Sequence, residues 1–214
     1  MSRRLVAWVL LVAAIAGVAY ASRFAAGPPD RNILYRWSTT ANELVVFGII
    51  AAVTLAIARG ERGLLALRRP RSWKRALGLG LLLLLVVYGA VAAVDPLLHG
   101  GREQGLTPTS WQPDHAPAFA ANFFVIGAVA PFVEELLFRG LGYSLLERFG
   151  RVPAILVVGC SFAVYHGLVQ ALPELAIFGC ALAWLRARTG SVLPGMLLHA
   201  TFNSISLGAA VAFA

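Results

Sequence analysis

The chain has 214 residues, of which 59% are hydrophobic and only 13% are charged, and its formal net charge is +8. Soluble domains are typically about 45–50% apolar and about 25% charged, and a globule of this length cannot bury so much apolar surface. The composition therefore excludes a soluble globular domain and predicts an integral membrane protein.

Seven apolar runs predict helices that cross the bilayer, because its hydrocarbon core needs about 20 apolar residues per helix. The sixth run is short, and the fourth is expected to continue as a helix toward Phe149. The fold class that follows is all-α, a polytopic transmembrane helix bundle of about seven spans. In chain order, the predicted spans are Leu5–Ser22, Asn42–Ala58, Ala76–Val94, Ala116–Arg139, Val152–Leu168, Glu174–Leu185 and Val192–Ala212.

The basic residues predict the orientation of these spans, since cytoplasmic loops carry the excess of Lys and Arg. With a cytoplasmic N-terminus, only four of the 18 basic residues fall outside, namely Arg23, Arg31, Arg36 and Arg102. We therefore predict a cytoplasmic N-terminus and an outer C-terminus. In a soluble protein this charge would favour nucleic acid. Here the basic loops are expected to meet anionic lipid headgroups, and no nucleic-acid partner is predicted.

The first span has features of two kinds of segment. It begins with Arg3 and Arg4 and ends near Ala19-Tyr20-Ala21, a pattern that resembles a cleavable signal peptide. Because the apolar run is long enough to cross the bilayer, we expect it to be retained as a helix. Cleavage would leave the later topology unchanged.

Two adjacent acids, Glu134 and Glu135, lie in the fourth predicted span. A charge inside the bilayer costs at least about 2.5–3.5 kcal/mol, so an adjacent pair needs a reason. Neighbours on a helix point about 100° apart, whereas Arg139 follows Glu135 at the i, i+4 spacing of a favourable ion pair. We predict that Arg139 neutralises Glu135 and that Glu134 faces a cavity. The alternative is that all three side chains lie at the cytoplasmic interface.

Two later spans each carry a histidine and a second residue four positions away. Phe162 and His166 share one face of the fifth span, and His199 and Asn203 share one face of the last. Imidazole titrates near neutral pH, which suits proton transfer, and two donors that meet at one point can stabilise an oxyanion. Taken singly, each has a simpler explanation as a packing histidine or as an asparagine that bonds neighbouring helices.

Together the motifs are E-E-x-x-x-R, F-x-x-x-H and H-x-x-x-N, on three separate spans in this order. This combination resembles the CPBP family of CAAX-protease and bacteriocin-processing (Abi) intramembrane proteases, which includes the type II CAAX prenyl endopeptidases. The resemblance covers about residues 117–206, which would form the catalytic core. Residues 1–116, which are N-terminal spans and an outer loop, carry no motif, and residues 207–214 end the last span.

The resemblance implies an endopeptidase of the bacterial inner membrane that hydrolyses a peptide bond in a membrane-associated, prenylated or peptide substrate. Glu134 would act as general base on water, and His166 would orient that water. His199 and Asn203 would stabilise the oxyanion.

The other motif positions would support the geometry of this site, and they are Glu135, Arg139 and Phe162. The family is often called metalloprotease, so the resemblance leaves a divalent metal open. If a zinc ion is present, Glu134, His166 and His199 would be its ligands. The chain lacks the H-E-x-x-H motif of zincins, and we favour attack by water without a metal. The sequence does not indicate an oligomeric state.

Two other functions remain open at this point. A catalytically silent relative would act as a bacteriocin-immunity or membrane-assembly factor, although the intact motifs argue against it. A proton-coupled transporter would use the buried Glu and His residues as a relay. Transporters typically show matched broken helices in two halves, and no such symmetry is evident in the sequence.

Overall fold

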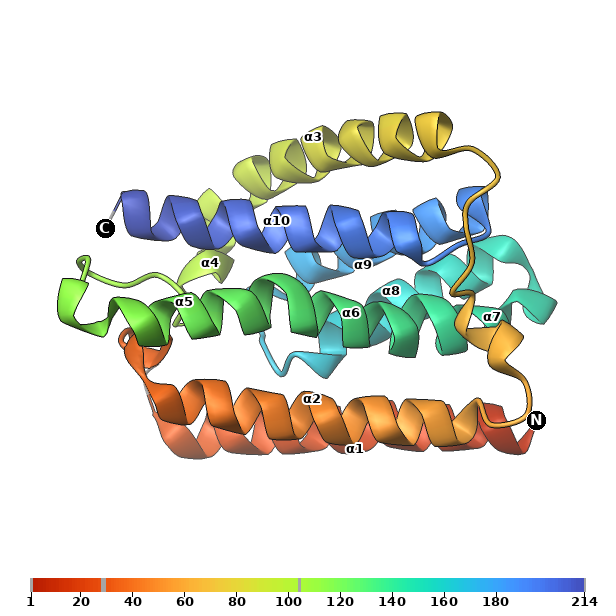
Figure 1. The fold of residues 1–214 in the computed structure, drawn as a ribbon, viewed down its shortest axis with the longest axis horizontal. Coiled ribbons are helices and arrows are strands. Elements are labelled where there is room, and N and C mark those ends of the chain that lie inside the picture. Colours follow the sequence, from red (N-terminus) through yellow and green to blue (C-terminus); the bar gives the residue numbers. More distant parts are fainter. Residues whose placement is uncertain (1, 28–29, 104, 214) are drawn as a thin grey trace.

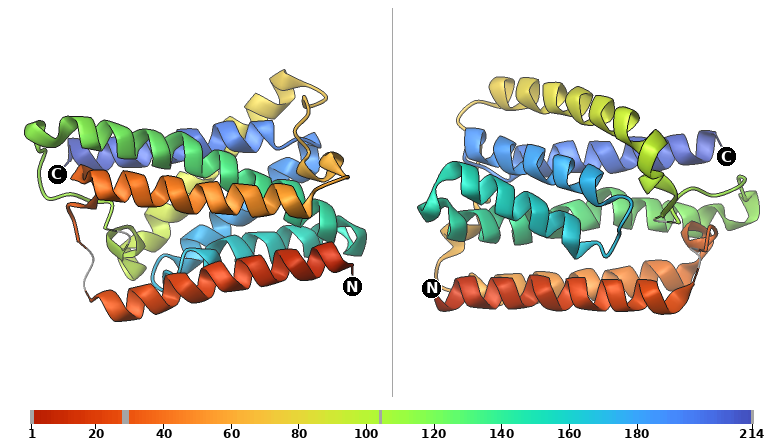
Figure 2. Two further views of the ribbon diagram at one scale, coloured as in Figure 1. Left: turned by 60° about the horizontal axis from the view of Figure 1, so that its bottom comes forward. Right: turned by 180° about the vertical axis from the view of Figure 1, so that it is seen from behind.

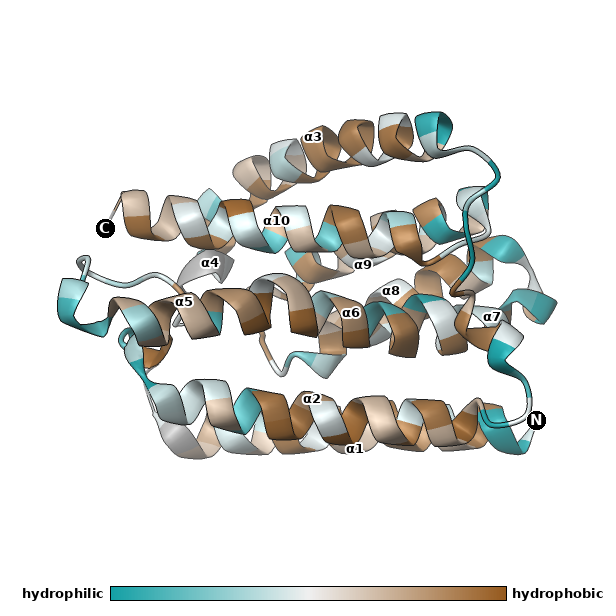
Figure 3. Cartoon of the chain, viewed as in Figure 1, coloured by the Kyte–Doolittle hydropathy of each residue, from teal (hydrophilic) through white to brown (hydrophobic). Residues whose placement is uncertain are grey.

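The computed structural model describes residues 2–27, 30–103 and 105–213, and every regular element among them is helical. The long helices run side by side as one bundle, with the two chain ends at opposite ends of it (Figure 1). Hydrophilic residues gather toward both ends, and hydrophobic residues fill the length between them (Figure 3). The predicted all-α, polytopic membrane bundle is confirmed.

The elements follow the predicted runs, with short helices between them. The α-helices are α1 (Arg3–Ala26), α2 (Trp37–Ile57), α3 (Trp73–Leu98), α4 (Gly100–Glu103), α5 (Ala116–Phe124), α6 (Ala130–Glu135), α7 (Tyr143–Leu146), α8 (Arg151–Tyr165), α9 (Leu172–Thr189) and α10 (Leu193–Ala212). Short 3-10 helices cover Ile33–Tyr35, Arg62–Leu65, Pro113–His115 and Glu147–Phe149.

Five stretches of the described chain are long and apolar enough to cross a membrane. They are Arg3–Ala25, Trp37–Ile57, Trp73–Leu98, Pro113–Phe149 and Leu193–Ala212. The fifth and sixth predicted spans are helical too, as α8 and α9, but α8 has only 15 residues. At about 1.5 Å per residue it measures about 22 Å, less than the ~30 Å of a hydrocarbon core.

Helices α8 and α9 therefore form a hairpin that stops short of the far side. Figure 2 shows the turn between them about midway along the bundle. A hairpin that enters and leaves on one side does not alter the parity of the crossings, so the chain ends stay on opposite sides as predicted. The hairpin also explains how His166, which follows α8 directly, reaches the middle of the bundle.

The turn of this hairpin is held by a side chain from the segment after α3. The backbone N–H groups of Val169, Gln170 and Ala171 donate to the Glu103 carboxylate at 2.7–3.0 Å. The Arg23 guanidinium of α1 lies 2.5 Å from the same carboxylate. Backbone N–H groups at membrane depth must find hydrogen-bond acceptors within the protein. The Glu103 carboxylate is the acceptor for these three.

The fourth span changes its helical register on both sides of α6. Val125–Val129 and Leu136–Gly142 are π-helical, and α6 between them carries the two acids. π-helical turns occur mostly as short insertions within α-helices, often at functional sites. Glu134 and Glu135 therefore lie on a short α-helical segment that has a π-helical segment on each side.

Helix α1 belongs to the core of the bundle. Trp8 is 2% exposed, and its indole Nε1 donates to the Leu137 carbonyl at 3.0 Å. A Cβ added to Gly142 would lie 2.6 Å from the same indole, so only glycine admits the ring here. Loss of α1 would uncover both the Leu137 carbonyl and Phe138, which packs edge-on against Trp8. Retention of the first span stays a prediction.

Candidate active site

The His199 ring lies between two carboxylates that come from a different helix. Its Nε2 is 3.6 Å from Glu134 Oε2, and its Nδ1 is 3.3 Å from Glu135 Oε1. None of the three side chains is more than 6% exposed. Helices α6 and α10 thus bring together residues more than 60 positions apart in the sequence.

Glu135 is also the partner of Arg139. Arg139 Nη1 lies 3.0 Å from Glu135 Oε1, and both side chains are completely buried. The other terminal nitrogen of Arg139 donates to the Gly179 carbonyl of α9 at 2.9 Å, and the guanidinium lies over the Phe162 ring at 4.3 Å. The ion pair predicted from the i, i+4 spacing is present. Its burial argues against the alternative that these residues lie at the cytoplasmic interface.

These contacts assign the proton positions on His199 from hydrogen-bond chemistry. A carboxylate that is paired with Arg139 accepts hydrogen bonds, so Nδ1 donates to Glu135. The Nε2 atom then faces Glu134, and a proton can pass between them. Glu135 therefore orients the His199 ring, and Arg139 neutralises the negative charge of Glu135.

His166 ends α8, beside the same group of aromatic rings. Its Nδ1 lies 2.7 Å from the Phe162 carbonyl, which can only accept, so Nδ1 carries the proton and Nε2 keeps a free lone pair. The Phe162 ring contacts both imidazoles, with centroid separations of 4.7 Å to His166 and 5.6 Å to His199. Phe162 therefore holds the two histidines as neighbours. His166 is half-buried, whereas Glu134 and His199 are buried.

Asn203 has a structural partner that the sequence did not predict. In the first π-helical segment, the Ala130 N–H bonds to the Val125 carbonyl five residues earlier. The next donor in that register would be Pro131, which has no N–H. The Ile126 carbonyl instead accepts from Asn203 Nδ2 at 2.9 Å. One amide N–H of Asn203 is used in this way, and the second is available for the predicted oxyanion role.

Two further residues interact with Glu134, and sequence reasoning missed both. The Tyr165 hydroxyl is a side-chain hydrogen-bond partner of Glu134, and Glu43 of α2 interacts electrostatically with both residues. Within the described chain, Glu43 Oε2 is buried and has no hydrogen-bond partner. The available signals were a single acid in the second apolar run and a tyrosine directly before His166.

The zinc ligands named from the sequence, Glu134, His166 and His199, stay a prediction. Among the described residues, no group of three or more His, Cys, Asp or Glu side chains is placed to hold a metal. Glu134 and His199 face each other, and the bond from His166 Nδ1 to the Phe162 carbonyl leaves the His166 Nε2 lone pair open. The arrangement suits proton transfer between side chains and a water molecule.

Comparison with known proteins places this site within one matched segment. Residues 116–205 match the family model described as type II CAAX prenyl endopeptidase Rce1-like. No curated protein and no solved structure matches the chain. The matched segment contains every predicted site residue from Glu134 to Asn203.

Proposed function

Because the chain belongs to the CPBP/CAAX protease family through residues 116–205, we propose that it is an intramembrane endopeptidase in which Glu134 activates water. The supporting observation is the buried series Glu134, His199, Glu135 and Arg139, linked by contacts of 3.0–3.6 Å. Each carboxylate in it has a defined neighbour, so Glu134 and Glu135 can take different roles.

The proposed reaction begins with a water molecule beside Glu134. The free Nε2 of His166 accepts a hydrogen bond from this water and so directs its lone pair at the peptide carbonyl. Glu134 takes the other proton as the water oxygen bonds to the carbonyl carbon. The carbonyl electron pair moves onto oxygen and forms the tetrahedral oxyanion.

The oxyanion is stabilised by donors from α10. A protonated His199 Nε2 and the second amide N–H of Asn203 would donate to it. As the tetrahedral intermediate collapses, the carbon–nitrogen bond breaks and Glu134 returns its proton to the leaving amine. The products are a carboxylic acid and an amine, and Glu134 is again a carboxylate.

The substrate we propose is a peptide segment that is lipidated or otherwise associated with the membrane, cleaved in the bacterial inner membrane. Glu134 is 5% exposed and His199 2% exposed. Such a segment must therefore displace neighbouring side chains to reach them. The half-buried His166 and Asn203 mark the side from which water and peptide would approach.

The test is cleavage of membrane-tethered peptides, including a farnesylated C-a-a-X peptide, by the purified protein in liposomes. Loss of a general base typically lowers the rate about 100- to 10,000-fold, and we expect that loss in Glu134→Gln. Asp114→Asn, an exposed position outside the site, is the control for altered charge. Full activity of Glu134→Gln, in protein that inserts normally, would overturn the proposal.

A further inference from the structure

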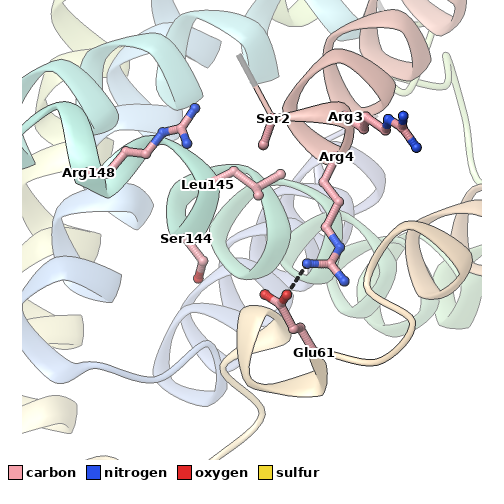
Figure 4. Close-up of a pocket in the computed structure, with 7 residues that line it drawn as sticks. All are labelled: Ser2, Arg3, Arg4, Glu61, Ser144, Leu145 and Arg148. Carbon is pink, nitrogen blue, oxygen red and sulfur yellow. Dashed lines mark hydrogen bonds and ion pairs between the residues drawn. The ribbon is translucent and has the colours of Figure 1, made fainter.

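A pocket of about 540 Å³ opens at the end of the bundle that we predict to be cytoplasmic. It is built by the start of α1, the turn after α2, α7 and the 3-10 helix that follows α7 (Figure 4). Three guanidinium groups, two hydroxyl groups and one carboxylate supply its polar atoms. The lining residues are Ser2, Arg3, Arg4, Glu61, Ser144, Leu145 and Arg148.

The single acid of the pocket is paired within it. Glu61 forms an ion pair with Arg4, whose second terminal nitrogen donates to the Arg59 carbonyl at 3.2 Å. Arg148 extends toward Ser2, whereas the exposed Arg3 guanidinium stands at the rim and points outward (Figure 4). The Arg148 guanidinium lies over the Phe149 ring at 4.6 Å, a contact that leaves its N–H groups available. The pocket therefore carries positive charge that Glu61 does not cancel.

A buried cation stands directly behind the pocket wall. Arg186 is 4% exposed, lies over the Tyr143 ring at 5.2 Å, and donates to Ser144 Oγ at 3.4 Å. Its Nε is buried and has no hydrogen-bond partner in the described chain. Because Ser144 accepts from Arg186, its own hydroxyl proton is free to be donated into the pocket.

The positive end of α1 lies at the same place. This helix has 24 residues, and the Ser2 hydroxyl, which also lines the pocket, accepts from the Leu5 N–H at 3.3 Å. The positive end of a helix attracts anions, and phosphate groups are typical ligands there. Arginine forks and hydroxyl donors match phosphate oxygens as well.

We propose that this pocket binds a phosphate group and that its occupant is the headgroup of an anionic phospholipid. The pocket opens at the level where headgroups meet the bundle, and basic pockets between transmembrane helices on the cytoplasmic side bind such lipids. Exposed apolar side chains of α1, Val6, Val9 and Leu10, continue from the pocket toward the membrane interior and would contact the acyl chains. The bound lipid would join the start of α1 to α7 and so stabilise the packing of Trp8.

The experiment uses the full chain in nanodiscs and compares neutral phosphatidylcholine with mixtures that contain phosphatidylglycerol. Native mass spectrometry counts retained lipids, and thermal unfolding reports stability. Each Arg near an anionic membrane surface contributes about 1 kcal/mol, so Arg3→Gln/Arg148→Gln should weaken phosphatidylglycerol retention about thirtyfold. It should also remove the rise in unfolding temperature that phosphatidylglycerol causes. Ser144→Ala should show a smaller loss of retention.

The matched control is Arg69→Gln/Arg71→Gln, which removes the same charge from exposed positions on the same side of the bundle. An equal loss in both double variants would show attraction to the whole basic surface and would overturn the proposal. Inorganic phosphate, added to the protein in neutral lipid, separates the two sources of the anion. A full stabilisation by phosphate alone would overturn the assignment to a lipid.

Discussion

Gly195 of α10 leaves room for the Glu135 carboxylate, because an added Cβ would stand 2.5 Å from Oε2. Gly195 and His199 are four residues apart on α10, and both face Glu135. The spacing of the helices at the site is therefore limited by the absence of a side chain at one position.

Gly195→Ala should displace Glu135 and with it the His199 ring. Misplacement of a catalytic group by about 1 Å can cost about 100-fold in rate, and we expect a loss of this order in peptide cleavage. Gly208→Ala on the same helix is the control, since a Cβ there meets nothing within 4 Å. Equal activity in the two variants would mean that the position of Glu135 is unimportant.

The buried ion pair yields a prediction about stability. Arg139→Met should destabilise the protein by about 3–5 kcal/mol, because it leaves the Glu135 charge buried without its cation. Glu135→Leu/Arg139→Met, which removes both charges, should recover most of that loss yet remain inactive. Unfolding in mixed detergent micelles measures the first effect, and the cleavage assay measures the second. A double variant as unstable as Arg139→Met would contradict this account of the pair.

The bond between Asn203 and Ile126 can be separated from any catalytic role of the amide. Asn203→Ala should cost about 1–3 kcal/mol, because the Ile126 carbonyl loses its donor. Pro131→Ala in the same chain supplies a backbone N–H that can bond this carbonyl, so the double variant should regain stability. If Asn203 also stabilises the oxyanion, cleavage stays low in the stable double variant. Recovery of cleavage would assign Asn203 a structural role only.

Substitutions of Trp8 test whether packing of α1 against the segment after α6 stabilises the fold. Trp8→Ala should cost about 3–5 kcal/mol from lost core packing, whereas Trp8→Phe loses mainly one hydrogen bond, worth about 0.5–1.5 kcal/mol. Thermal unfolding of the two variants beside the wild-type protein gives the comparison. An unchanged unfolding temperature in Trp8→Ala would show that α1 is dispensable for the fold.

The sequence could predict those features that depend on local spacing. The Glu135–Arg139 ion pair follows from helical periodicity, and the seven apolar runs all became helices. Run length alone did not show that α8 and α9 turn back inside the bundle. Two features distinguish this pair from the other spans. Helix α8 has only 15 residues, and α9 carries the charged residues Glu174, Arg186 and Arg188.

Other features depend on contacts between distant segments and had no local signal. Glu43 lies in an apolar run about 90 residues before Glu134, and nothing in that run indicates which helix it faces. The bond from Asn203 to Ile126 arises only after the helix adopts a π register around Pro131. Pro131 is visible in the sequence of this span, but the side chain that compensates for its missing N–H is not.

The Glu103 carboxylate that receives the N–H groups of Val169, Gln170 and Ala171 has a consequence for the surrounding lipid. Since the α8–α9 hairpin ends partway along the bundle, the segment that carries Glu103 lies against its turn and brings the Glu103–Arg23 ion pair to that depth. We expect the hydrocarbon layer beside these helices to be thinner than the unperturbed bilayer. Such thinning would shorten the distance that water must travel to reach the middle of this protein.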